Sequence, residues 1–209
     1  MLIHIHEEMT REALSACFSP RALEVIIAAN CKQDSLPGQI GHDEYHFDNN
    51  AIDEGYRYIK EQRGFVLASL LSPGVLSAWI AFGRLLHTAQ DFYAHTNYVP
   101  LWLDAHAHNG TPPTPPEIDP VQKSLIESSE IRSGKIYLPM DVLYFVPFLR
   151  ELSFGLLPDD SHAKMNLDSP KQGPRFAYAR AAAVKRTVYE FEILEKILTP
   201  DMFAKFTDM

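Results

Sequence analysis

Apolar and polar positions along this chain repeat with the period of a helix. Apolar side chains recur three and four residues apart over long stretches, a spacing that places them on one face of an α-helix. No stretch alternates apolar and polar side chains between turn residues, as a half-buried strand would. The pattern therefore predicts an all-α protein, and a length of 209 residues predicts one domain that spans residues 1–209.

The same pattern divides the chain into about seven helices. They are expected at residues 6–18, 20–32, 50–71, 72–99, about 120–131, 139–152 and 175–198. Proline suits a first helical turn, so Pro20 is expected to open the second helix, and the last helix is expected to end before Pro200. The helix at 72–99 is apolar around most of its circumference, so we expect it at the centre of the fold. Two stretches rich in turn residues, 104–120 and 158–174, are predicted to be loops.

Composition narrows the classes of function. The net charge is −8, and no run of Lys or Arg suggests a surface for nucleic acid, so a nucleic-acid partner is not expected. No segment approaches the roughly 20 apolar residues of a membrane span. The N-terminus lacks a basic stretch followed by an apolar run, so we expect a cytoplasmic protein or one exported by a non-classical route. Cys17 and Cys31 are expected to be small, buried apolar side chains rather than a disulfide framework.

The segment HTAQDFYAH, residues 87–95, places side chains that could bind a metal ion inside the predicted central helix. His87, Asp91 and His95 are four residues apart, so they share one helix face. A buried carboxylate without a partner is costly, and imidazole and carboxylate are common zinc ligands. Either the two histidines only donate hydrogen bonds to Asp91, or a metal ion holds the three side chains together.

Further histidines and carboxylates occur on separate segments. His4 and His6 lie at the start of the first helix, Asp34 precedes His46 by twelve residues, and His162 is followed by Asn166 and Asp168. A set of this kind on several helix ends and loops fits a polynuclear metal site better than isolated polar groups in a core. No Glu-x-x-His pair occurs, which disfavours a di-iron helical bundle.

These segments together resemble a known family. HEEMTREAL, EYHFDNN, GRLLHTAQDFYAHTNYV and HAKMNLDSP look like the HET-C (heterokaryon-incompatibility) branch of the zinc-dependent phospholipase C family, whose fold is shared with single-strand-specific zinc nucleases. The resemblance covers residues 4 to about 190. It implies a multi-helix domain of the zinc-dependent phospholipase C type.

The resemblance implies up to three zinc ions and a set of ligands. Asp34, His46, His87 and Asp91 would hold the first ion, and Asp91 would bridge to a second ion that also takes His6. His95 and His162 would hold the third with a carboxylate downstream. Two positions stay open: Asn166 stands where the family has an acid, so Asp168 is the alternative, and either His4 or the N-terminal amine completes the His6 site.

The function implied by the resemblance is that of a phospholipase C. Such an enzyme cleaves glycerophospholipids such as phosphatidylcholine at a membrane surface to diacylglycerol and a phosphorylated head group. Water activated by zinc is the nucleophile, and Asp34 would orient or deprotonate it. Two alternatives remain: a zinc-dependent single-strand nuclease, and a non-catalytic HET-C-like toxin or interaction module whose metals are structural.

Overall fold

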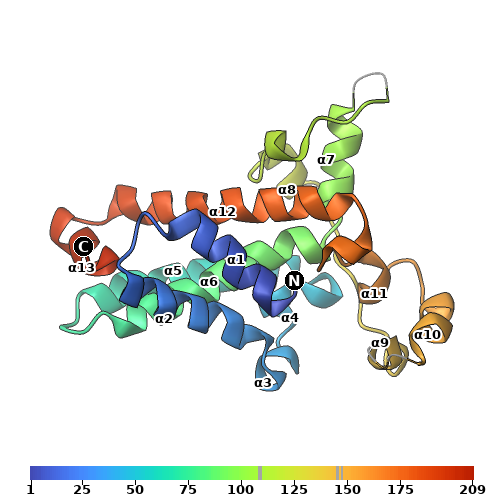
Figure 1. Cartoon of the computed structure of the whole chain (residues 1–209), viewed down its shortest axis with the longest axis horizontal. Coiled ribbons are helices and arrows are strands. Elements are labelled where there is room, and N and C mark those ends of the chain that lie inside the picture. Colours follow the sequence, from blue (N-terminus) through green and yellow to red (C-terminus); the bar gives the residue numbers. More distant parts are fainter. Residues whose placement is uncertain (108–109, 145, 147) are drawn as a thin grey trace.

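A computed structural model describes residues 1–107, 110–144, 146 and 148–209 (Figure 1). This part of the chain is all-helical, as predicted, with isolated bridges in place of strands. The α-helices are α1 (Ile3–Leu14), α2 (Pro20–Cys31), α3 (Leu36–Gln39), α4 (Asp43–His46), α5 (Ile52–Leu70), α6 (Leu76–His95), α7 (Tyr98–His106), α8 (Lys123–Ile126), α9 (Met140–Tyr144), α10 (Arg150–Leu156), α11 (His162–Met165), α12 (Arg175–Ile197) and α13 (Pro200–Thr207). Four 3-10 turns, η1 (Lys32–Asp34), η2 (Asp48–Asn50), η3 (Pro115–Glu117) and η4 (Pro170–Gln172), lie between them.

The central helix is α6, which is buried over almost its whole length. It packs against α2, α5 and α12, while α1 covers α2 and α12. Figure 1 shows these five helices as an elongated bundle with α12 along one edge. Its core is one continuous apolar cluster that extends from Met1 to Phe206. Full burial of a large apolar side chain contributes about 1.5–3 kcal/mol, so residues such as Trp79 and Phe92 supply most of the packing free energy.

Glycine permits one especially close contact between α2 and α6. A Cβ added at Gly83 would lie 2.3 Å from the carbonyl oxygen of Ile26 and 2.8 Å from the Cβ of Ala29. Because Gly83 lies one turn before His87, this contact also brings the end of α2 next to the first histidine of the central helix.

Short helices gather at the end of the bundle where α6 ends. Figure 1 shows α4, α7, α8, α9, α10 and α11 at this end, and α13 with the C-terminus at the other. α4 packs against α5 and α6, and α11 contacts α6. The ends of several elements therefore meet near the C-terminal half of α6.

Some predicted helix boundaries were wrong. The helix expected at 72–99 is two helices, α6 and α7, because Thr96 is extended and Asn97 turns away to bond Arg132. α12 ends at Ile197, before Pro200 as predicted, but it is not the last helix: Pro200 occupies the first turn of α13, which Thr199 caps. The predicted loop at 104–120 begins after α7 and contains η3; its residues 108–109 lie outside the described residues.

No helix in the described part of the chain is both long and apolar enough to cross a membrane. Cys17 and Cys31 are free thiols, each partly buried.

Candidate metal centre

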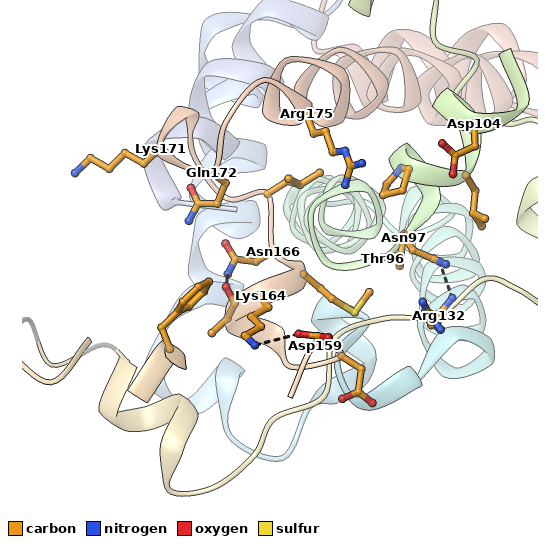
Figure 2. A pocket seen from close by; sticks show the side chains of 17 residues that line it. Thr96, Asn97, Asp104, Arg132, Asp159, Lys164, Asn166, Lys171, Gln172 and Arg175 are labelled. Carbon is orange, nitrogen blue, oxygen red and sulfur yellow. Dashed lines mark hydrogen bonds and ion pairs between the residues drawn. The ribbon is translucent and has the colours of Figure 1, made fainter. Parts of the chain in front are cut away.

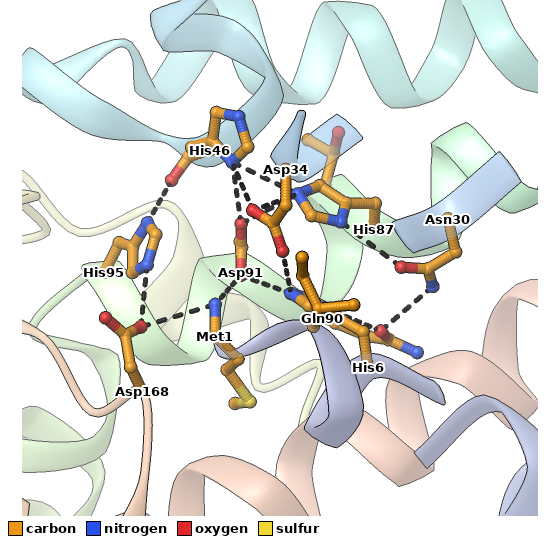
Figure 3. Close-up of polar contacts among 12 residues, drawn as sticks. Met1, His6, Asn30, Asp34, His46, His87, Gln90, Asp91, His95 and Asp168 are labelled. Carbon is orange, nitrogen blue, oxygen red and sulfur yellow. Dashed lines mark hydrogen bonds and ion pairs between the residues drawn. The ribbon is translucent and has the colours of Figure 1, made fainter. Parts of the chain in front are cut away.

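Nine groups from separate parts of the chain converge at the end of α6, and Figure 3 labels all of them except His162. α6 itself carries His87, Asp91 and His95, and their side chains are 0–6% exposed. The other groups are the amino group of Met1, His6 on α1, Asp34 at the end of η1, His46 on α4, His162 on α11, and Asp168 after α11. Histidine and carboxylate groups in this region lie close enough together to hold metal ions.

The first group of ligand atoms has the dimensions of a tetrahedral site. His46 Nδ1 and His87 Nε2 lie 3.0 and 3.1 Å from Asp91 Oδ2, and 3.1 Å from each other. Asp34 Oδ1 lies 3.7 Å from His87 Nε2 and 4.0 Å from His46 Nδ1. Four ligands at about 2.0–2.1 Å from one cation are separated by about 3.3–3.4 Å. The four side chains therefore fit one tetrahedral cation.

The second oxygen of Asp91 faces a different set of groups. Asp91 Oδ1 accepts a hydrogen bond from the amino group of Met1 and lies 3.1 Å from His6 Nε2. His6 Nε2 is fully buried and makes no hydrogen bond of acceptable geometry, and neither does Asp34 Oδ2, 3.9 Å away. A bridging carboxylate and two buried polar atoms without partners are the features expected around a second cation.

A third set lies beyond His95. His95 Nε2 is 3.0 Å from Asp168 Oδ1, which is also 3.3 Å from the amino group of Met1. The rings of His95 and His162 lie edge to face, with centroids 4.6 Å apart. Asp48, on η2, contacts His162 from outside the cluster.

Every histidine of the cluster has one nitrogen bonded to an oxygen acceptor outside it. These pairs are His6 Nδ1 with Gln90 Oε1 (2.7 Å), His46 Nε2 with Gly38 O (3.3 Å), His87 Nδ1 with Asn30 Oδ1 (3.2 Å), His95 Nδ1 with His46 O (2.8 Å) and His162 Nδ1 with Asp48 Oδ1 (2.7 Å). Each of these nitrogens donates a proton, so the other nitrogen of a neutral ring is a lone pair. When both rings are neutral with these tautomers, two lone pairs face each other at the 3.1 Å contact between His46 and His87, an arrangement that a cation between them stabilises.

A buried amide network fixes two of these rings. Gln90 Nε2 donates to the hydroxyls of Thr10 and Thr187, at 3.1 and 2.9 Å, which turns Gln90 Oε1 toward His6. Asn30 Nδ2 donates to Gln90 Oε1 at 3.1 Å, which turns Asn30 Oδ1 toward His87. The network therefore sets which nitrogen of His6 and His87 faces the cluster.

The surroundings of Asp91 and His87 favour the protonation states that these two residues need as metal ligands. Although burial alone would raise it, the Met1 ammonium and nearby histidines hold the pKa of Asp91 well below its usual range. Burial holds the pKa of His87 well below its ordinary value. At neutral pH Asp91 is therefore an anion and His87 a neutral imidazole, which are the ligating forms.

The structure resolves the two positions that the sequence left open. His4 is exposed on the surface of α1, next to Glu7 and Arg180, so expecting it in the cluster was wrong, and the amino group of Met1 lies there instead. Asn166 donates its amide to the backbone carbonyls of His162 and Ala163 at 3.0 and 2.9 Å, whereas Asp168 faces the cluster. The other predicted ligands, His6, Asp34, His46, His87, Asp91, His95 and His162, are brought together; that they bind metal stays a prediction.

Sequence reasoning missed the residues that surround the ligands. Asn30, Asp48 and Gln90 are buried and bond the histidines, yet none was proposed for the site. Gln90 and Asp48 lie within the two motifs already singled out, HTAQD and HFD, which was the available signal. Asn30 has no such signal, because only the close contact between α2 and α6 brings it to His87.

A pocket lies beside the cluster (Figure 2). It has a volume of about 910 Å³ and is lined by the sequence neighbours Thr96, Asn166 and Leu167, but by none of the cluster histidines. Figure 2 shows the Lys164–Asp159 ion pair at its rim and Arg175 across from it. This pocket is therefore distinct from the space that the cluster encloses.

Comparison with known proteins assigns the N-terminal half of the chain to a protein family. The VWA7 N-terminal domain family matches residues 4–110, just over half of the chain, which includes His6, Asp34, His46, His87, Asp91 and His95. The von Willebrand factor A domain-containing protein 7 of Rattus norvegicus is 34% identical over 83 residues, which cover 38% of this chain and 9% of the rat protein. The chain thus corresponds to a small part of that relative. No solved structure matches it. By the extent of the family match, the chain belongs to the VWA7 N-terminal domain family.

Proposed function

We propose that this chain is a zinc-dependent phosphodiester hydrolase of the phospholipase C type. One observation carries the proposal: histidine nitrogens and carboxylate oxygens from separate elements converge in a buried space, where His6 Nε2 and Asp34 Oδ2 have no hydrogen-bond partner. A buried set of imidazoles and carboxylates suits zinc.

The chain offers residues for up to three ions. Asp34, His46, His87 and Asp91 would hold the first, Asp91 with His6 the second, and His95, His162 and Asp168 the third. The Met1 amine would join the second site only after it loses the proton that it donates to Asp91. Bound zinc would supply a water nucleophile at neutral pH and positive charge opposite the leaving oxygen.

Asp34 is the residue best suited to handle the proton of the attacking water. Its Oδ1 faces the first ligand group, while Oδ2 has no hydrogen-bond partner. Burial and the negative charge of Asp91 raise the pKa of the Asp34 carboxyl, so it accepts a proton more readily than an exposed aspartate. In the proposed reaction Asp34 orients the water and takes its proton.

Apolar side chains near the cluster favour a lipid over a nucleic acid. Leu2 and Ile3 adjoin Met1 and are 46% and 52% exposed, and Leu36 and Ile40, just after Asp34, are 70% and 67% exposed. A bilayer can accept such side chains, whereas a polyanion gains nothing from them and meets a net charge of −8. Phospholipid is therefore the proposed substrate.

The test measures hydrolysis of phosphatidylcholine vesicles and of single-stranded DNA by the zinc-loaded full chain. We expect release of diacylglycerol from phosphatidylcholine vesicles, loss of this activity on chelation and its return with zinc. Asp34→Asn should lower the rate about 10²–10⁴-fold, as for loss of a general base, while Asp104→Asn on α7 serves as the control. Cleavage of single-stranded DNA without lipid hydrolysis would make the chain a nuclease, and a zinc-loaded chain inert on both would make the metals structural.

A further inference from the structure

A left-handed turn surrounds Asp48. Phe47, Asn49 and Asn50 have φ values of 59°, 53° and 60°, in the left-handed region that asparagine adopts more often than most residues and phenylalanine seldom adopts. The surrounding structure therefore imposes this conformation on Phe47, next to Asp48. A backbone outlier of this kind is typical of functional sites, so the turn calls for a role for Asp48.

Hydrogen bonds lock this turn to residues 133–136. The side-chain oxygens of Asn49 and Asn50 accept from the backbone N–H groups of Ile136 and Ser133, each at 2.8 Å. The backbone N–H of Asn49 donates to the carbonyl of Gly134 at 2.8 Å. Residues 133–136 therefore hold both the side chains and the backbone of the turn through hydrogen bonds.

The same segment also holds His162. The backbone N–H of His162 donates to the carbonyl of Lys135 at 2.8 Å, and a Cβ added at Gly134 would lie 2.6 Å from the Cα of His162. Gly134 N–H donates to the carbonyl of His95 at 3.0 Å. Residues 133–136 thus fix the separation between Asp48, His95 and His162 through the backbone.

Asp48 accepts a hydrogen bond from His162. Asp48 is 7% exposed, and its Oδ1 accepts from His162 Nδ1 at 2.7 Å. His95 Nδ1 is 3.6 Å away and donates to the carbonyl of His46 instead. Asp48, His95 and His162 lie close enough together to hold one ion. Two ligands of one zinc ion are separated by about 3.3 Å, however, so the contact of 2.7 Å between Asp48 and His162 fits a direct hydrogen bond better than joint ligation.

We propose that Asp48 is the positioning residue of the outer cation site: it holds His162 with Nδ1 protonated, so that Nε2 is the nitrogen offered to the ion shared with His95 and Asp168. This inference rests on the proposed function only in that the centre binds zinc. It also explains why the site does not need an acid at position 166: the amide of Asn166 hydrogen-bonds the backbone of α11 instead. Negative charge at the outer site then comes from Asp168 directly and from Asp48 through His162.

The test measures zinc content and ring protonation rather than activity. The full chain and its Asp48→Ala, Asp48→Asn and Asn166→Ala variants are equilibrated at buffered free zinc, and bound zinc is counted by elemental analysis. We expect Asp48→Ala to bind the weakest zinc ion about 10–100-fold less tightly, the usual cost of losing such a partner. In the same variant, we expect the more tightly bound zinc ions to remain bound. Asp48→Asn keeps an oxygen acceptor and should recover part of the loss, and Asn166→Ala should bind zinc like the parent.

Nitrogen-15 NMR of the histidine rings supplies the second measurement. In the zinc-loaded parent, His162 should carry its proton on Nδ1 and bind zinc through Nε2. Unchanged affinity in both Asp48 variants, or zinc on Nδ1 of His162, would overturn the inference. Should Asp48→Ala fail to fold, Asp48→Asn and the NMR assignment decide alone. A parent that binds zinc yet hydrolyses nothing would end the proposed enzyme activity but leave this inference intact.

Discussion

At the scale of single residues, Asp91 is the link between the ligand groups. One of its oxygens faces His46 and His87, and the other faces His6 and the Met1 amine. An amide presents one oxygen and one N–H₂ group, so it cannot serve two cations in this way.

We therefore expect Asp91→Asn to lose zinc and activity together. The loss of affinity should exceed the roughly 10–100-fold that follows removal of an outer hydrogen-bond partner. Elemental analysis after equilibration at fixed free zinc measures it, with Asp104→Asn as a control of equal charge change. Full zinc occupancy in Asp91→Asn would show that the carboxylate does not bridge.

The sequence predicted the ligands better than their surroundings. The four-residue spacing of His87, Asp91 and His95 places them on one face whatever the tertiary structure, so the helical pattern alone was sufficient. Asn30 and Asp48 reach their histidines only through contacts between distant segments. No spacing rule describes such contacts, so Asn30 could not be found in advance, and only its place in the HFD motif pointed to Asp48.

At the scale of elements, the approach of α2 to α6 places Asn30 next to His87. Gly83 makes this approach possible, because any side chain there would collide with the backbone of Ile26. Gly64, in the exposed part of α5, has open space around its Cα instead.

Gly83→Ala should lower the free energy of unfolding by about 1–3 kcal/mol, as expected for an overpacked contact. It should also weaken zinc binding, since α2 must move away and carry Asn30 with it. Gly64→Ala should stabilise the protein by about 0.5–1 kcal/mol, because alanine favours a helix where space allows. Urea unfolding of both variants checks this. Equal effects of the two substitutions would show that the α2–α6 contact is not close-packed.

Element boundaries were predictable only where local rules decide them. α2 begins at Pro20 as expected, because proline suits a first turn. α6 ends at His95 instead of continuing to residue 99, because Asn97 exchanges hydrogen bonds with Arg132 and Glu130. These partners lie more than 30 residues away in the sequence, so helical periodicity cannot predict the hydrogen bonds to them.

At the scale of the whole molecule, the absence of strand patterning correctly predicted an all-α fold. The burial of so many titratable groups in its core makes stability depend on pH. Although burial lowers it, the Asp48 carboxylate raises the pKa of His162 from 6.5 to about 9. The pKa of His46 is raised as well, because Asp91 raises it by more than burial lowers it.

Without metal, these raised pKa values stabilise the folded state below pH 6.5, and the contribution is lost as the pH rises through about 9. For His162 the loss between pH 6.5 and 8.5 is about 2 kcal/mol. With zinc the histidines are neutral ligands and binding strengthens as protons leave, so stability should instead rise over this range. Urea unfolding of chelated and zinc-loaded protein at these pH values compares the two slopes. Parallel slopes would argue against histidine ligation.

The central claim is that the lone pairs and carboxylates at the end of α6 enclose divalent cations. Elemental analysis of the purified chain, followed by thermal unfolding before and after chelation, tests it most directly. The account predicts at least two zinc ions per chain and a fall in melting temperature when they are removed, since metal bound only by the folded state stabilises it. A chain that takes up no zinc from buffered solution, and melts at the same temperature with and without chelator, would contradict it.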